Sequence, residues 1–223
     1  MDIFVSWFAK IFLAPFVKML FLKEIKGKKN LPDEKHNFIL ASNHQSHLDL
    51  LVNGYICVPR KFRYVGQVDQ YTGMQGFLRD VIYLIAGTIP MDRRSKDSKK
   101  EAMQIAADCL RKGENIIVFP EGTRTRTGAM GAGKIGSLKL AVDTDKPIVP
   151  VGITGVFDLL PPGGKLKIRK QVKANVGSPM YFQEEKEKLK ALSSDSPEYR
   201  EILEEMAKKL MARIKELKDE IEK

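Results

Sequence analysis

The sequence has few of the residues that build disulfide frameworks and metal sites. Its 223 residues include two cysteines, Cys57 and Cys109, and three histidines. Two cysteines cannot form the disulfide framework of a small secreted domain, and such scarcity is typical of a reducing compartment. Cys109 lies in the helical pattern EAMQIAADCLRKG. We therefore interpret it as a buried small hydrophobe rather than a reactive thiol.

The N-terminal stretch, residues 1–29, is apolar but lacks an uncharged run of the roughly 20 residues that a membrane-spanning helix needs. Lys10 and Lys18 interrupt it, and Pro15 predicts a kink or a break. It also lacks the charge order and the small-residue cleavage site of a secretory signal. Helical spacing leaves a broad apolar face made of Ile3, Phe4, Trp7, Phe8, Ile11 and Phe12. We predict an amphipathic anchor that lies in the membrane interface. Packing of this helix on the protein's own core is the alternative.

Positive charge is concentrated in one part of the chain. The net charge is +10, yet residues 183–223 hold 10 Lys and Arg against 12 Asp and Glu, so residues 1–182 carry +12. A basic body of this kind favours an anionic partner, either a membrane, a phosphorylated small molecule or nucleic acid. The basic clusters lack the interleaved aromatic residues that stack on bases, so we predict no nucleic acid partner. A solvated basic surface without a role is the remaining alternative.

Alternating strand and helix patterns predict the fold. Short apolar runs rich in β-branched residues predict strands at 38–42, 62–65, 115–119, 147–153 and 166–176. Helical patterns lie between several of them, at 46–57, 98–113 and 136–144. In the second helix, Ser98 with Glu101 resembles a capping box, and Gly113 marks its end. We predict a single α/β domain with a mostly parallel central sheet covered by helices, spanning residues 30–182.

The C-terminal segment, residues 183–223, predicts a long helix. Ser196 is a good N-cap and Pro197 suits the first helical position. One apolar stripe then runs along the helix, formed by Tyr199, Ile202, Leu203, Met206, Leu210, Ile214, Leu217 and Ile221. We expect this stripe to pack on the core, with coiled-coil dimerisation as the alternative.

The heptapeptide NHQSHLD (43–49) holds the residue types of several kinds of site. A zinc site needs further ligands, and the only other histidine is His36. A nucleophilic Ser46 would need a base among its immediate neighbours, whose side chains diverge. A plain helix start is consistent with Ser46 as N-cap and Asp49 three residues later. A general base is equally consistent, since His44 follows a buried strand and Asp49 could orient its ring. The heptapeptide alone leaves these last two interpretations open.

A second glycine-rich segment, GAMGAGKI (128–135), approaches a phosphate-binding P-loop. Ile135 stands where that loop needs a hydroxyl for Mg²⁺, and the preceding residues are not a buried strand. We therefore reject a nucleotide-hydrolysing function.

Three further blocks accompany NHQSHLD, namely GTIPMDR (87–93), FPEGTRT (119–125) and IVPVGI (148–153). In order and rough spacing, the four blocks over residues 36–180 resemble those of the glycerolipid acyltransferases. Among these, the chain is most similar to the bacterial 1-acyl-sn-glycerol-3-phosphate acyltransferases. The sequence departs from the family pattern in the segment VGQVDQY (65–71), which has Gln67 where many members of the family have a lysine close by.

The resemblance implies specific roles for residues of the four blocks. His44 is the implied catalytic base and Asp49 its partner, whereas Pro150 belongs to the acyl-chain side. The residues implied to bind the phosphate and glycerol of the substrate are Arg93, Glu121, Gly122, Thr123, Arg124 and Lys134. No metal is implied at the site.

The resemblance also implies a reaction and a location. A fatty acyl group would pass from acyl-CoA or acyl carrier protein, with no other cofactor, to the sn-2 hydroxyl of lysophosphatidic acid, giving phosphatidic acid for phospholipid synthesis. The enzyme would be peripheral, on the cytoplasmic face of the cell membrane. Another acceptor, such as glycerol 3-phosphate or a different lysophospholipid, is the first alternative. A non-catalytic protein that binds anionic lipids is the second.

Overall fold

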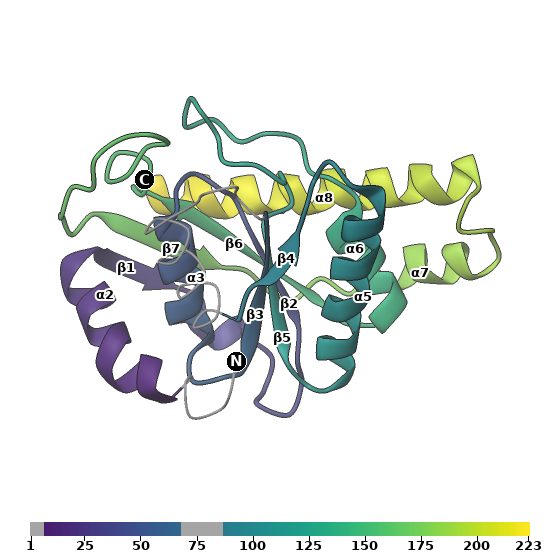
Figure 1. Cartoon of the computed structure of the whole chain (residues 1–223), viewed down its shortest axis with the longest axis horizontal. Helices are drawn as coiled ribbons and strands as arrows, with labels where there is room; N and C mark the ends of the chain where they lie inside the picture. The colour runs from purple at the N-terminus through teal and green to yellow at the C-terminus, as the bar shows by residue number, and fades with distance from the viewer. Residues whose placement is uncertain (1–6, 68–86) are drawn as a thin grey trace.

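A largely parallel sheet forms the centre of the protein (Figure 1). The structure is a computed structural model, and it describes residues 7–67 and 87–223. Its strand order is β1-β7-β6-β2-β5-β3-β4, and among these described strands only the β6–β7 pair is antiparallel. The strands are β1 (Leu22–Lys26), β2 (Ile39–Ser42), β3 (Phe62–Gln67), β4 (Ile89–Met91), β5 (Asn115–Val118), β6 (Ile148–Thr154) and β7 (Val172–Val176). The predicted α/β architecture is confirmed.

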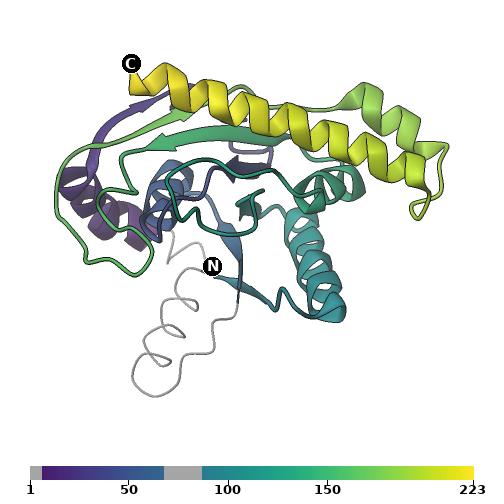
Figure 2. The same ribbon diagram turned by 90° about the horizontal axis from the view of Figure 1, so that it is seen from above.

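Helices cover both faces of this sheet (Figure 2). One face carries α2 (Ala14–Leu20) and α3 (Leu48–Cys57), and the other carries α5 (Lys96–Arg111), α6 (Gly136–Thr144) and α8 (Pro197–Glu222). Around β2, Phe38 and Leu40 pack toward α3, whereas Ile39 and Ala41 pack toward α5 and α6. The strand is thus apolar on both faces, as a parallel strand between two helical layers must be.

Two predicted element boundaries are wrong. The strand expected at 166–176 begins only at Val172, because the residues before it lie exposed outside the sheet. The second helix begins at Lys96, and its N-cap is Ser95 rather than Ser98. The Ser95 Oγ accepts the backbone N–H of Ser98 at 3.1 Å, so the earlier of two serines caps the helix and adds a turn to it. Gly113, with a φ of 83°, ends this helix as predicted.

The N-terminal segment departs from the predicted anchor of residues 1–29 at its C-terminal end. After a π-helix (Ala9–Leu13) and α2, residues Leu22–Lys26 form β1 and pair in parallel with β7. Only the helical part therefore remains free to act as an anchor. Its exposed apolar side chains, between 46% and 61% accessible, are Trp7, Phe8, Ile11, Phe12, Leu13, Phe16 and Met19. Ile3 and Phe4 lie outside the described residues. Within the described ranges, the helices are all too short or too polar to cross a bilayer.

The C-terminal segment holds two helices, α7 (Gln183–Lys190) and α8, where the sequence predicted one. Helix α8 begins as predicted, since the Ser196 Oγ accepts the N–H of Tyr199 at 3.1 Å. Its apolar stripe is buried against β6 and β7, with Ile202 only partly covered. A Cβ at Gly152 would lie 2.3 Å from the backbone nitrogen of Lys218, so glycine in β6 permits this close approach.

Candidate active site

The His44–Asp49 pair lies at the carboxyl edge of the sheet. His44 follows β2, and Asp49 stands in the first turn of α3. The His44 Nδ1 lies 2.9 Å from the Asp49 Oδ2, with the Asp49 side chain fully buried and the His44 side chain 11% exposed. When Nδ1 carries the proton and donates it to the carboxylate, Nε2 holds a free lone pair. The pair therefore has the geometry of a base with an orienting carboxylate.

The predicted pairing of Ser46 with Asp49 is present just before α3. The helix begins at Leu48, and the residue at the cap position is His47, whose side chain makes no capping hydrogen bond. The Ser46 Oγ accepts the N–H of Leu48 at 3.2 Å and donates to the carbonyl of Leu160 at 2.8 Å. The Asp49 Oδ2 accepts the N–H of Ser46 at 2.8 Å. The reciprocal bonds of a capping box exist, but they shape the turn before the helix rather than its first residue.

Three contacts join the first and third sequence blocks at His44. Its backbone N–H donates to the Glu121 Oε1 at 2.8 Å, and its carbonyl accepts the N–H of Thr125 at 3.0 Å. Its ring stacks on Phe119, with the centroids 3.8 Å apart and the planes 12° from parallel. The position of His44 thus depends on residues more than seventy positions away. The sequence did not predict the contacts that Phe119 and Thr125 make with His44.

Glu121 has a structural task that the sequence did not predict. Its buried carboxylate accepts the N–H of His44 through Oε1 and the N–H of Gly131 through Oε2, the latter at 2.7 Å. Burial raises the pKa of this carboxyl above its ordinary value of 4.5. Because both oxygens hold backbone groups, Glu121 is a positioning residue in this structure, and its predicted contact with glycerol stays a prediction.

Gly122 and Lys134 lie against each other beside Glu121. Gly122 has a φ of 69°, a conformation that favours glycine, and a Cβ there would lie 2.8 Å from the Lys134 Nζ. The N–H of Lys134 donates to the carbonyl of Pro120 at 2.8 Å. The glycine-rich segment that resembled a P-loop therefore folds back onto the third block and brings its lysine to the site.

The remaining predicted head-group residues follow the carboxyl ends of other strands. Arg93 lies just after β4, and Thr123 and Arg124 lie just after β5. Since β4, β3, β5 and β2 are mutually parallel, these loops share one edge of the sheet with His44. Both arginines are half-buried and Thr123 is exposed. Their common contact with one phosphate stays a prediction.

Pro150 lies in the middle of β6 rather than in a loop at the carboxyl edge. A Cβ added to Gly177 would meet the Pro150 ring and Leu217 of α8, so this proline faces the α8 side of the sheet. Its implied place on the acyl-chain side stays a prediction. The link between β6 and the first block is Asn43, whose amide donates to the carbonyl of Ile153 at 2.9 Å and accepts the N–H of Ile153 at 2.8 Å. Asn43 was missed because its partner is 110 residues away.

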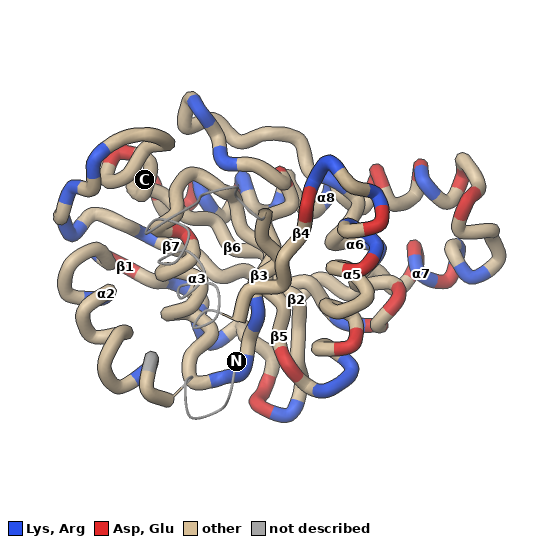
Figure 3. The backbone as a smooth tube through the Cα atoms, in the orientation of Figure 1, with Lys and Arg blue, Asp and Glu red and all other residues tan. Residues whose placement is uncertain are grey.

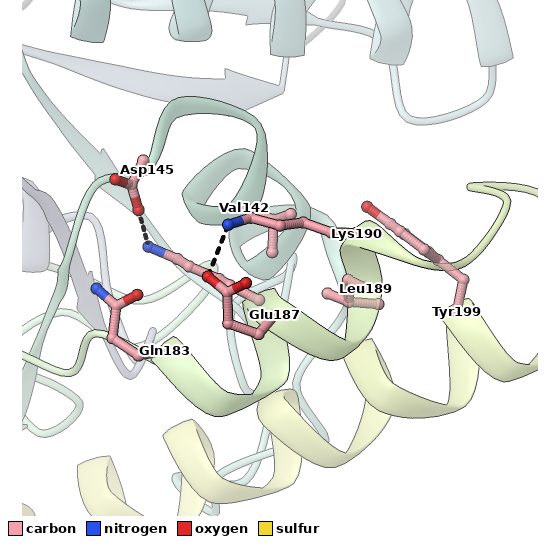
Figure 4. A pocket seen from close by; sticks show the side chains of 8 residues that line it. Val142, Asp145, Gln183, Glu187, Leu189, Lys190 and Tyr199 are labelled. Carbon is pink, nitrogen blue, oxygen red and sulfur yellow. Dashed lines mark hydrogen bonds and ion pairs between the residues drawn. The ribbon is translucent and has the colours of Figure 1, made fainter.

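A cavity of about 340 Å³ lies elsewhere (Figure 4). It is lined by residues of α6, α7 and α8, among them Glu187 and Lys190 of α7, and by Asp145, which directly follows α6. Asp145 precedes β6, so this cavity is at the amino edge of the sheet, opposite His44. Its charges neutralise one another, with Lys186 bonded to Asp145 at 2.8 Å and Lys190 to Glu187 at 2.6 Å. Both of these carboxylates are thus paired with lysines, and His44 stays the predicted base.

The two cysteines are unsuited to nucleophilic catalysis. Burial raises the pKa of the Cys57 thiol to about 12 and also raises that of Cys109. Both side chains are buried, so neither presents a thiolate to a substrate. Across residues 7–67 and 87–223, histidine, cysteine and carboxylate side chains do not gather into a metal-binding group.

Comparison with known proteins places these blocks in a family. The family model described as Acyltransferase matches residues 23–154. A chloroplastic 1-acyl-sn-glycerol-3-phosphate acyltransferase of Brassica napus is 29% identical over 160 residues, or 70% of this chain and 43% of that protein. The human 1-acyl-sn-glycerol-3-phosphate acyltransferase alpha is 33% identical over 140 residues, or 60% of this chain and 46% of that protein.

A solved structure agrees with this placement. The crystal structure of the 1-acyl-sn-glycerophosphate acyltransferase from Thermotoga maritima matches with a TM-score of 0.62 and 26% identity, covering 96% of this chain and 78% of that one. The chain spans less than half the length of the curated plant and animal relatives that it matches. The family model covers more than half of this chain. The chain therefore belongs to the acyltransferase family.

Proposed function

We propose that this protein transfers a fatty acyl group from a thioester, acyl-CoA or acyl carrier protein, to the sn-2 hydroxyl of 1-acylglycerol 3-phosphate. The product is phosphatidic acid, a precursor of phospholipids. The observation that carries the proposal is the His44–Asp49 pair, 2.9 Å apart and bonded through the His44 backbone to Glu121 of the third block. The names of the matched relatives support the choice of acceptor.

The base in this reaction is the His44 Nε2. It takes the proton of the substrate hydroxyl while that oxygen attacks the thioester carbonyl carbon. The tetrahedral intermediate collapses, the carbon–sulfur bond breaks, and the imidazolium returns the proton to the departing thiolate. The products are the ester and a free thiol. The buried Asp49 carboxylate offsets the positive charge that His44 carries during this step.

The substrate phosphate is held by the cations at the same edge of the sheet. Arg93 and Arg124 offer bidentate hydrogen bonds to phosphate oxygens, and Lys134 adds a point charge beside Gly122. Binding the phosphate away from the reacting centre fixes the 2-hydroxyl relative to His44. The binding energy of the phosphate thereby offsets the entropy lost when the hydroxyl is oriented for attack. We expect no cofactor beyond the acyl donor.

The protein acts at a membrane surface, on the cytoplasmic face, as a peripheral enzyme. This location is supported by the exposed apolar face of residues 7–19, which no described part of the chain covers. Lys10 and Lys18 flank this face, and the Lys10 Nζ lies 4.5 Å from the centroid of the Trp7 ring. Aromatic side chains with flanking lysines suit the level of the lipid headgroups.

Release of free thiol from two acyl donors, with a panel of acceptors, tests this proposal. We expect thiol release with 1-acylglycerol 3-phosphate, and its loss by several orders of magnitude in His44→Ala, whose ring can no longer take the proton. Activity of that variant at the parent rate would show that His44 is not the base. A preference for glycerol 3-phosphate would favour the alternative acceptor. Lipid binding without thiol release from either donor would favour a non-catalytic protein.

A further inference from the structure

The loop of residues 163–170, here called the basic–apolar loop, is a surface that the proposed reaction does not use. Every residue of it is exposed, and none belongs to a helix or strand. Leu166 is 50% exposed and Ile168 is 66% exposed. Cations alternate with them at Lys165, Lys167, Arg169 and Lys170.

The ends of this loop are fixed to the anchor helix and to the catalytic turn. Next to the loop, the N–H groups of Gln171 and Val172 donate to the carbonyl of Phe21, directly after α2, at 3.1 and 2.8 Å. On its other side, the carbonyl of Leu160 accepts the Ser46 hydroxyl, and that of Leu159 accepts the N–H of Lys167. The loop therefore spans from the turn that holds His44 to the helix with the exposed apolar face.

The loop and α2 also lie on the same face of the sheet. Val156 and Leu159, which lead into the loop, pack in the hydrophobic cluster that contains residues of α2 and α3. Figures 1 and 2 both show the loop beside α2, and Figure 3 shows its cations as blue segments there. The exposed apolar side chains of the loop and of α2 thus border one surface.

Within residues 7–67 and 87–223, the four cations of the loop form no ion pair. Among the described residues, no carboxylate lies within ion-pair distance of its four cations, whereas on α8 Lys209, Arg213, Lys215 and Lys218 are all paired. Cations that attract anionic headgroups, alternating with side chains that can enter the headgroup layer, match the chemistry of an anionic bilayer. An acidic protein would match the cations but would leave Ile168 and Leu166 without an apolar environment.

We propose that the basic–apolar loop is a second membrane contact, which binds an anionic lipid bilayer together with α2. The inference rests on the proposed action at a membrane. One amphipathic helix leaves the body of the protein free to tilt about it. A second contact, joined to the Ser46 turn, fixes that tilt and so fixes the position of His44 relative to the lipid surface.

Co-sedimentation of the full chain with vesicles tests the inference. The vesicles contain phosphatidylcholine alone or a mixture with phosphatidylglycerol. The variants are Lys165→Gln/Lys167→Gln/Arg169→Gln and Leu166→Ser/Ile168→Ser. Matched controls on α5, on the opposite face, are Lys96→Gln/Lys99→Gln/Lys100→Gln and Ile105→Ser, whose cations are exposed and whose isoleucine is 40% exposed.

We expect the charge variant to lose affinity for mixed vesicles on the order of 100-fold, since each cation near such a surface contributes about fivefold. The loss should shrink in high salt. The apolar variant should lose about 10-fold or more on mixed vesicles. The α5 controls should bind as the parent does. Circular dichroism of the variants should match that of the parent, because the exposed loop supports no helix or strand.

Two results would overturn the inference. In one, the loop variants bind mixed vesicles as tightly as the parent. In the other, they bind normally and lose only transfer from acyl carrier protein, which would make the loop a protein contact. Thiol release with a detergent-dispersed acceptor is measured separately. Its absence in the parent would contradict the proposed function, while vesicle binding would still report on the loop.

Discussion

The substitution Asp49→Asn separates the hydrogen bond that this carboxylate makes to His44 from the charge balance that we propose for it. The Asp49 Oδ2 accepts three N–H groups, from the His44 ring at 2.9 Å and from the backbones of Gln45 and Ser46 at 2.6 and 2.8 Å. The other oxygen, Oδ1, is buried and accepts no hydrogen bond from the described residues. An asparagine can place its amide oxygen at the Oδ2 position and its NH₂ at the Oδ1 position. All three bonds then survive, the negative charge is lost, and an NH₂ group takes the place of the buried Oδ1.

The expected loss of rate follows from the electrostatics of the pair. Two unit charges about 4 Å apart attract by about 4 kcal/mol at an effective dielectric constant of 20. The amide dipole of asparagine recovers part of this attraction, so we expect the barrier to rise by about 3 kcal/mol and kcat to fall about 100-fold. Stability should stay within about 1 kcal/mol of the parent, because removal of a buried charge offsets the cost of a buried NH₂ group while the three hydrogen bonds remain.

Single-turnover thiol release and chemical denaturation measure the two effects, and Asp49→Ala is the control. Alanine removes the acceptor of two backbone N–H groups, and each unsatisfied donor costs about 1–3 kcal/mol, so this variant should lose both activity and stability. If Asp49→Asn keeps kcat within about fivefold of the parent, the carboxylate charge does not assist the reaction. If it unfolds as readily as Asp49→Ala, the bonding scheme around Oδ2 is wrong.

Three other predictions concern positioning, backbone conformation and packing. Glu121→Gln leaves one of two backbone N–H groups without an acceptor, so kcat should fall about 10-fold with little change in KM. The raised pKa of Glu121 means that its ionisation costs stability, so this variant should gain stability relative to the parent as the pH rises above 4.5, as measured by denaturation across pH. Gly122→Ala, at a φ of 69° and against Lys134, should lose about 1–2 kcal/mol of unfolding free energy and should also lower kcat. The control Gly113→Ala, at a φ of 83° with no neighbour within 4 Å, should lose stability alone. Equal kcat values for the two variants would refute a role for the contact between Gly122 and Lys134. Leu210→Ala, at a fully buried position, should reduce the free energy of unfolding by about 2–5 kcal/mol with normal kcat at low temperature, and a smaller loss would show that α8 is not part of the core.

Local patterns in the sequence were sufficient for most of the fold. The runs at 38–42, 115–119 and 147–153 became β2, β5 and β6, which are buried on both faces. The run at 62–65 became β3, in which buried and partly buried residues alternate at its start. The stripe of the last helix and its Ser196 cap were equally readable, because helical period and cap chemistry are local properties. The four sequence blocks were readable for a different reason, namely their resemblance to a family.

Tertiary contacts decided what local patterns could not. The segment Leu22–Lys26 looks like the end of an amphipathic helix, and it became a strand because β7, nearly 150 residues later, offers an unpaired edge. The cap of the second predicted helix, α5, lies at Ser95 rather than Ser98, because the Ser95 Oγ accepts the N–H of Ser98 three residues later.

The site shows the same division. Its sequence determined which residue types could abstract a proton and bind a phosphate, because those properties belong to the side chains of His44, Asp49, Arg93 and Arg124 themselves. Only the tertiary structure decided that Glu121 accepts the backbone N–H of His44 and that the neighbouring Asn43 bonds to the backbone of Ile153. Such hydrogen bonds join positions 77 and 110 residues apart, and the parallel packing of β2, β5 and β6 is what brings these partners together.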